Sequence, residues 1–176
     1  AYAAQAVQDI DAIVDRCAMV SQIDDQADPP QPVACRIDDI LREIRSQQPS
    51  AHRITLAVAE NAAAVCVQSD PVLLRTVLRN VLDNARKFTR EGSVTLRYEI
   101  DPRHNQLRVT VTDTGCGIPP EKRNDIFGMP SDDSKATPGL SLALCRLIAR
   151  HLSGNISLDE AYTAGARFIF TIPAKP

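Results

Sequence analysis

The sequence predicts an α/β domain preceded by one long helix, and three observations support this fold class. Apolar side chains recur at heptad spacing near the start, which predicts an amphipathic helix through Ile10, Ile13, Cys17 and Val20. A proline-rich segment over residues 28–32 ends that helix. Beyond it, helical periodicity alternates with the period-two pattern of strands. We therefore expect a helical unit over residues 1–26, a linker over 27–32 and the α/β domain over 33–176.

The first half of the α/β domain begins with a helix. Ile37, Ile40, Leu41 and Ile44 follow helical spacing, and Pro49 lies beyond the end of that helix. Residues 53–59 alternate as a half-buried strand, and residues 65–67 form a shorter one. Asp70 and Pro71 then match the N-cap and first position of a helix. This helix has a wide apolar face.

The second half predicts a hairpin, a helix and two closing strands. Residues 93–100 and 106–112 alternate around a polar turn at 101–105. Thr137 and Pro138 cap a helix that runs to about His151 and is ended by Gly154. Residues 156–158 and 167–172 complete the expected strands. The first helix of the chain either packs on this domain or forms half of a bundle with another segment.

Composition restricts the function classes. The 176 residues carry 20 Lys and Arg against 22 Asp and Glu, a net charge of −2. This balance argues against a nucleic-acid partner, which favours a basic face. No apolar run is long enough for a membrane span, and the start matches no signal peptide. The start also lacks an initiator Met, which indicates a fragment or a processed product. Five dispersed cysteines predict reduced thiols and a cytoplasmic location.

Two amides and a lysine share one face of the helix that Asp70 begins. Asn80, Asn84 and Lys87 follow at spacings of four and three residues. An Asn oxygen can coordinate Mg²⁺, which takes further ligands from water and phosphate, and a Lys can contact a phosphate. The alternative is a solvated polar face with a chance pair of amides.

A carboxylate and two glycines follow the second strand of the hairpin. Asp113 stands where the strand ends, and Gly115 and Gly117 allow a ligand to approach the backbone closely. The carboxylate could accept a hydrogen bond from the exocyclic amine of adenine. The alternative is an ordinary Asx turn. Further along, the helix start at Gly139 and Leu140 offers unpaired N–H groups to a phosphate, or is simply a capped helix.

The order of these stretches resembles the ATP-binding catalytic domain of bacterial sensor histidine kinases. Residues 80–89 (NVLDNARKFT) match the N box, and residues 113–119 (DTGCGIP) match the G1 box. Residues 125–127 are similar to the F box, residues 138–144 to G2, and residues 163–173 to the last glycine motif. The resemblance covers residues 33–173. It implies a two-layer α/β sandwich of the Bergerat (GHKL) type, with helices on one face of a mixed sheet.

The resemblance also implies roles for individual residues, with ATP and Mg²⁺ as cofactors. Asn84 would bind Mg²⁺, while Asn80 and Lys87 would be the catalytic residues near the phosphates. Asp113 would bind the adenine amine, and Gly115 and Gly117 would shape the base pocket. Gly139 and Leu140 would approach the phosphates. Hydrolysing relatives carry a Glu at the position of Asn80, and an amide cannot take a proton from water, which favours phosphoryl transfer.

The resemblance implies partners as well. Residues 1–26 are similar to the second helix of the family's dimerisation hairpin, so the full protein would form a homodimer and act on a response regulator. Any membrane anchor would lie in upstream segments.

The sequence departs from the family at the phosphoacceptor and at G2. None of the three histidines (His52, His104 and His151) has the family's acceptor motif around it. Thr137 and Ser141 replace two of the three G2 glycines, and the last motif has Thr163 and Ala166 where Gly and Ser are frequent. Two functions follow: a histidine kinase that phosphorylates a His outside this chain, or a degenerate kinase-like interaction module that binds ATP weakly or not at all.

Overall fold

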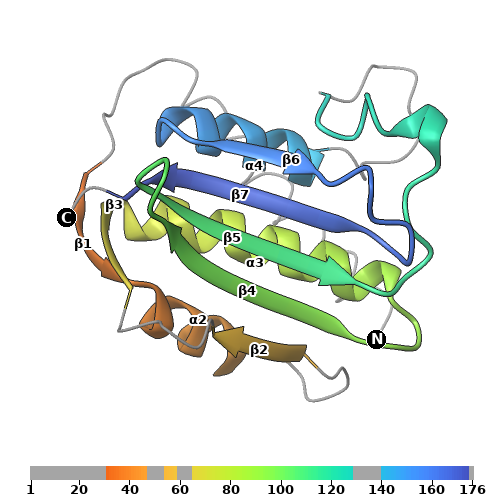
Figure 1. The fold of residues 1–176 in the computed structure, drawn as a ribbon, viewed down its shortest axis with the longest axis horizontal. Helices are drawn as coiled ribbons and strands as arrows, with labels where there is room; N and C mark the ends of the chain where they lie inside the picture. The colour runs from red at the N-terminus through yellow and green to blue at the C-terminus, as the bar shows by residue number, and fades with distance from the viewer. Residues whose placement is uncertain (1–30, 47–53, 59–64, 129–139, 175–176) are drawn as a thin grey trace, which may run out of the picture.

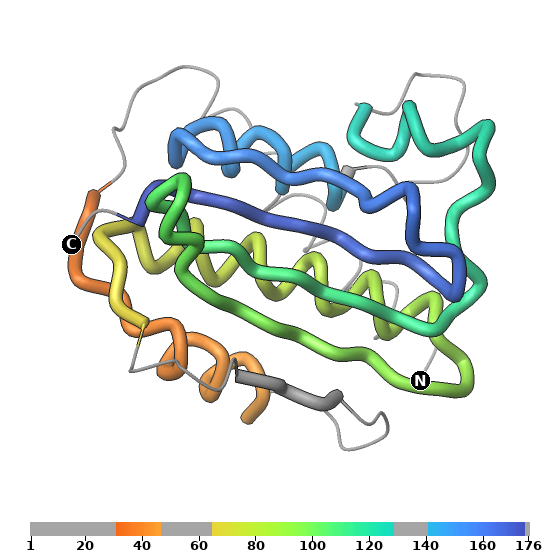
Figure 2. The backbone as a smooth tube through the Cα atoms, in the orientation of Figure 1, coloured from red at the N-terminus to blue at the C-terminus, as the bar shows by residue number. Residues whose placement is uncertain are grey.

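A five-stranded mixed sheet forms the centre of the domain (Figure 1). The structure is a computed structural model that describes residues 31–46, 54–58, 65–128 and 140–174. The strand order is β2-β4-β5-β7-β6, in which β2 is parallel to β4 and the other neighbours are antiparallel. The strands are β2 (Ile54–Val58), β4 (Val94–Asp101), β5 (Gln106–Asp113), β6 (Asn155–Leu158) and β7 (Arg167–Pro173). Figure 2 shows β5 and β7, which are far apart in sequence, side by side in the sheet.

Helices cover one face of this sheet. Helix α3 (Pro71–Phe88) contacts β4 and β5, helix α4 (Leu140–His151) contacts β6 and β7, and α2 (Ile37–Ser46) packs beside α3. Alternate residues of β5 and β7 are buried beneath the helices, while those between them are partly exposed. The core joins the two layers through Leu74, Leu78, Leu96, Leu107, Leu144 and Ile148, each at most 1% exposed. The predicted two-layer α/β sandwich is therefore confirmed.

Local sequence signals explain how α3 begins and how α4 ends. Asp70 caps α3 by accepting from the N–H groups of Val72 and Leu73 at 2.9 and 3.1 Å, as predicted. At the end of α4 the left-handed residue is Ser153 (φ 58°), and Gly154, which was predicted to end the helix, follows it. The Gly154 N–H donates to the Ala149 carbonyl at 2.7 Å, which closes a Schellman-type end.

A second, two-stranded sheet lies beside α2. Strand β1 (Val33–Arg36) pairs antiparallel with β3 (Cys66–Ser69), so that Val33 faces Ser69. Strand β3 was predicted one residue earlier, and β1 was not predicted. Of the four β1 residues only Cys35 is buried, so this strand has no apolar alternation of its own.

The predicted helix over residues 1–26 and most of the linker lie outside the described residues. The division into residues 1–26, 27–32 and 33–176 remains a prediction. Within the part of the chain that the structure describes, no helix is both long enough and apolar enough to span a membrane.

Polar contacts hold the turn between β4 and β5. Asp101 Oδ2 lies 2.8 Å from His104 Nδ1 and 3.2 Å from Arg108 Nη2, and Asp101 Oδ1 accepts from the Arg103 N–H. The hydrogen bond to His104, followed by that to Arg103, lowers the pKa of Asp101 from 3.8 to about 2. A carboxyl group whose pKa is lower in the folded state stabilises the fold above its unfolded pKa.

We therefore expect this turn to contribute to acid unfolding. Its stabilising effect should be complete above about pH 4 and should be lost as the pH falls toward 2. Chemical denaturation at a series of pH values should show a smaller loss of unfolding free energy between pH 4 and pH 2 in Asp101→Asn than in the unmodified chain. Parallel pH profiles for the two proteins would contradict this expectation.

Candidate nucleotide-binding site

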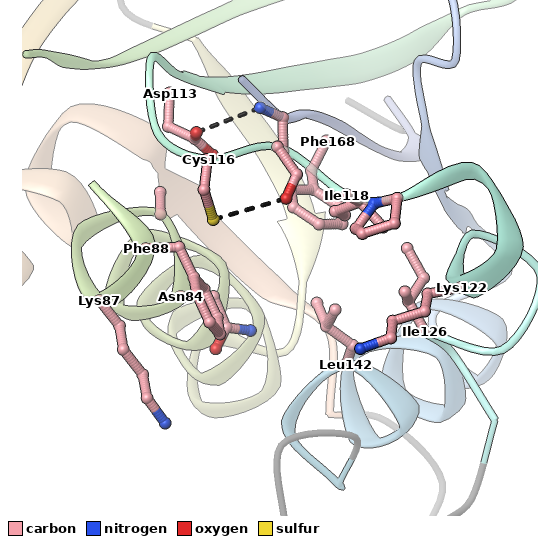
Figure 3. A pocket seen from close by; sticks show the side chains of 14 residues that line it. Asn84, Lys87, Phe88, Asp113, Cys116, Ile118, Lys122, Ile126, Leu142 and Phe168 are labelled. Carbon is pink, nitrogen blue, oxygen red and sulfur yellow. Dashed lines mark hydrogen bonds between the residues drawn. The ribbon is translucent and has the colours of Figure 1, made fainter. Parts of the chain in front are cut away.

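A cavity of about 620 Å³ lies between the C-terminal half of α3, the loop after β5 and the start of α4 (Figure 3). The short 3₁₀ helix η1 (Pro120–Lys122) closes another side. Both sequence stretches that predicted a ligand site contribute to this one cavity. Its lining comprises Asn84, Ala85, Lys87, Phe88, Asp113, Cys116, Gly117, Ile118, Pro119, Lys122, Ile126, Leu142, Ala166 and Phe168.

Helix α3 supplies Asn84 and Lys87 to the cavity. The Nδ2 atom of Asn84 is buried and has no hydrogen-bond partner. A buried amide without a partner is costly, so this side chain is suited to a ligand that satisfies it. Lys87 is exposed, and its side chain extends from α3 away from Asp113 in Figure 3. Its Nζ lies 5.7 Å from the centre of the Phe88 ring.

Asp113 is the buried carboxylate of the cavity, with 3% of its surface exposed. Its Oδ1 accepts from the backbone N–H groups of Gly115 and Ala166 at 2.9 and 3.1 Å. Its own N–H donates to the Ala166 carbonyl at 2.9 Å. The described contacts of the carboxylate therefore fall on Oδ1, which leaves Oδ2 as the acceptor for a ligand.

Two glycines let the loop after β5 pass close to its neighbours. A Cβ on Gly115 would lie 2.3 Å from the Phe88 carbonyl oxygen at the end of α3. Gly117 has a φ of +69°, which side chains rarely allow, and a Cβ there would lie 3.1 Å from the Gly165 carbonyl oxygen. Gly117 lines the cavity. Gly115 is not part of the lining, but it allows the loop after β5 to lie against the end of α3.

The remaining predicted residues are placed differently. Asn80 is 7% exposed and is not part of the cavity lining, and its Oδ1 accepts from the Ser141 hydroxyl at 3.1 Å. Ser141 is itself buried and thus faces α3. Leu140 is the first residue of α4. Gly139 lies outside the described residues, as do Thr137 and Pro138.

Sequence reasoning did not identify the apolar wall or a second cation. Phe88, Ile118, Ile126, Leu142 and Phe168 provide an apolar surface of the kind that a flat ring would contact. Of these, Ile126 belongs to the stretch that is similar to the F box. Lys122 adds a second positive charge opposite α3, and Cys116 adds an exposed free thiol.

Comparisons with known proteins show which family the chain resembles. The family model described as "Histidine kinase-, DNA gyrase B-, and HSP90-like ATPase" matches residues 69–176. The adaptive-response sensory kinase SasA of Trichormus variabilis is 33% identical over 143 residues, which cover 78% of this chain and 35% of that protein. The sensor protein EvgS of Escherichia coli K12 is 33% identical over 116 residues, which cover 62% of this chain and 10% of that protein. The chain thus spans about a third and a tenth of these two relatives.

Solved structures share the fold. Full-length ShkA in complex with AMPPNP superposes with a TM-score of 0.78 over 92% of this chain and 35% of that chain, at 24% identity. The mycobacterial sensor histidine kinase MprB superposes with a TM-score of 0.63 over 82% of this chain and 99% of that chain, at 29% identity.

Since the family model covers more than half of the sequence, the chain belongs to the family of histidine kinase-, DNA gyrase B- and HSP90-like ATPases. SasA is named a sensory kinase and MprB a sensor histidine kinase, which confirms the predicted resemblance to the ATP-binding catalytic domain of a sensor histidine kinase.

Proposed function

We propose that this domain binds ATP together with Mg²⁺ and transfers the γ-phosphoryl group to a histidine that is not among the three of this chain. The observation that carries this proposal is the convergence of Asn84 and Lys87 from α3 with Asp113 from β5 on one cavity. The name of the relative SasA, a sensory kinase, supports the kinase activity. We further propose that the complete protein is a homodimer and acts on a response regulator, as the family resemblance implies.

The adenine base fits the end of the cavity near Asp113. Oδ2 of this carboxylate is available to accept from the exocyclic amine, while Oδ1 is held by the Gly115 and Ala166 N–H groups. The apolar side chains of Ile118 and Phe168 would contact the ring. A fixed acceptor within an apolar pocket is the usual arrangement for a specific planar ligand.

The triphosphate fits the end of the cavity toward which α3 presents Asn84 and Lys87. Lys87 and Lys122 supply positive charge to that end. The described residues include no cluster of three or more His, Cys, Asp or Glu that could hold a metal ion. A single amide oxygen nevertheless suits Mg²⁺, which keeps waters and shares phosphate oxygens. Asn84 would thus be the protein ligand, and the ion would neutralise charge on the phosphates.

The chemistry of position 80 favours transfer to a protein side chain over hydrolysis. In the transfer, an imidazole nitrogen of the acceptor histidine forms a bond to the γ-phosphorus while the bond to the ADP oxygen breaks. This step needs positioning and charge stabilisation more than a base. Asn80 carries no proton-accepting group, and its oxygen is engaged by Ser141. We assign it the role of fixing the α3 surface beside Asn84.

We expect Asn84→Ala to remove the Mg²⁺ dependence of ATP binding. Loss of one ligand to a charged group should weaken the affinity for Mg²⁺-ATP roughly ten-fold, toward the value measured with EDTA. Asn84→Asp, which restores an oxygen ligand, is the matched control and should keep a response to Mg²⁺. Calorimetric titration with and without Mg²⁺ measures both. Equal responses to Mg²⁺ in Asn84→Ala and the unmodified chain would contradict the assignment.

Phosphotransfer itself is tested in the full-length protein with ATP labelled at the γ position. An acid-labile, alkali-stable label on a histidine supports the proposal. A full-length dimer that is saturated with ATP and stays unlabelled would favour the interaction-module function, and steady release of phosphate without label would favour hydrolysis.

A further inference from the structure

Tyr162 contacts the backbone of Asp113 from outside the cavity. It lies in the segment between β6 and β7, and its hydroxyl donates to the Asp113 carbonyl oxygen at 3.1 Å. Tyr162 does not belong to the cavity lining. The Ala166 N–H, which donates to Oδ1, belongs to the same segment, so this segment holds both the backbone and the side chain of Asp113.

The ring of Tyr162 is held by Arg167. The guanidinium carbon lies 4.2 Å from the ring centre, a close cation–π contact. Arg167 Nε donates to Thr112 Oγ1 at 3.2 Å, and its Nη1 pairs with Asp159 Oδ2 at 3.1 Å. Because Thr112 directly precedes Asp113, Tyr162 and Arg167 both contact the C-terminal end of β5.

Gly165, in the same segment between β6 and β7, is packed closely against Asp113. A Cβ on Gly165 would lie 2.1 Å from the Asp113 carbonyl oxygen, which is the same atom that accepts from Tyr162. A displacement of the segment between β6 and β7 must therefore displace the end of β5. The Asp113 carboxylate, which lines the cavity, would be displaced together with the end of β5.

We propose that Tyr162, held by Arg167, is a positioning residue that sets the place of the Asp113 carboxylate for the adenine amine. This inference rests on the proposed nucleotide function and adds a residue that touches neither base nor phosphate. A hydrogen bond weakens steeply when its angle or length departs from the optimum, so a small displacement of Asp113 reduces recognition of the amine specifically.

The test compares Tyr162→Phe with the unmodified chain in calorimetric binding of two nucleotides. ADP carries the exocyclic amine, and purine riboside 5′-diphosphate lacks it. We expect the affinity for ADP to fall about five-fold, the effect of one hydrogen bond, while the affinity for the second nucleotide stays unchanged. Tyr98→Phe is the matched control, since its hydroxyl donates to Asp38 on α2, and it should leave both affinities unchanged. An equal loss for both nucleotides, or no loss, would overturn the proposal.

Hydrogen exchange in the ligand-free protein gives a second readout. The Gly115 and Ala166 amides, which donate to Asp113 Oδ1, should exchange faster in Tyr162→Phe than in Tyr98→Phe. Unchanged exchange at both amides would overturn the positioning role, whatever happens to affinity. If the unmodified chain binds neither nucleotide, the proposed function fails, and the exchange rates alone decide whether Tyr162 holds Asp113.

Discussion

Replacing Asp113 by Asn is expected to weaken adenine-nucleotide binding by about 10- to 100-fold while the domain stays folded. Asn keeps an oxygen for the Gly115 and Ala166 N–H groups, so the loop after β5 retains its internal hydrogen bonds. It replaces the second oxygen by a donor, which then opposes the donor of the adenine amine. Hydrogen bonds to charged groups contribute about 1.5–3 kcal/mol, and each 1.4 kcal/mol changes affinity ten-fold. Calorimetric titration with ADP measures the change.

The matched control for this substitution is Asp125→Asn. Asp125 is exposed and does not line the cavity, so its neutralisation removes the same charge without touching the proposed base site. Its affinity for ADP should equal that of the unmodified chain. Asp113→Ala is a poorer test, because it leaves two backbone donors without their acceptor and should also destabilise the fold. An unchanged affinity for ADP in Asp113→Asn would contradict the assignment of Asp113 to the adenine site.

Replacing Gly115 by Ala is expected to destabilise the domain and to abolish tight nucleotide binding together. The added Cβ would lie 2.3 Å from the Phe88 carbonyl oxygen and 2.9 Å from its carbon, so backbone has to move. The loop after β5 would separate from the end of α3 and lose the hydrogen bond from the Cys116 N–H to Phe88. Forced overpacking of this kind costs about 1–3 kcal/mol. Denaturant unfolding and ADP titration measure the two effects.

Cys116→Ala serves as the neighbouring control for stability. Its side chain is exposed, so truncation should change the free energy of unfolding by about 0.5 kcal/mol or less. If Gly115→Ala were as stable as Cys116→Ala, the close contact between the loop and α3 would not constrain the fold.

The parts of the fold that could be predicted depend on neighbours in sequence. Asp70 caps α3 through N–H groups two and three residues away, and the β4–β5 hairpin closes over a short polar turn. Strand β1 was missed because its pairing with β3 is formed across some thirty residues, and its own pattern is not alternating. At the end of α4, Ser153 takes the left-handed conformation, while Gly154 is needed where a Cβ would lie 1.9 Å from the Thr171 carbonyl oxygen.

The residues of the site also divide into those that sequence patterns indicate and those that only the tertiary fold brings together. Asn84, Lys87, Asp113 and Gly117 could be predicted because Asn is a poor helix former, so a pair of Asn residues one turn apart is informative, and because the order of these residues resembles the N box and the G1 box. The apolar wall could not, since Ile118, Leu142 and Phe168 have the same chemistry as core residues and are recognised only once the cavity is formed. The placement of Asn80 depends on α4, which approaches α3 through the tertiary fold.

The hydrogen bond between Asn80 and Ser141 bears on how kinases and hydrolases of this superfamily diverge. The resemblance assigns a glutamate at this position to the relatives that hydrolyse ATP. In this chain such a residue would be one methylene longer and charged, in a place that is 7% exposed and already occupied by the Ser141 hydroxyl. Burial of a charge and overpacking both oppose the exchange. A glutamate at position 80 alone should therefore lower the stability of the fold. We expect an evolutionary or engineered change from phosphotransfer to hydrolysis to combine it with a change at Ser141 on α4.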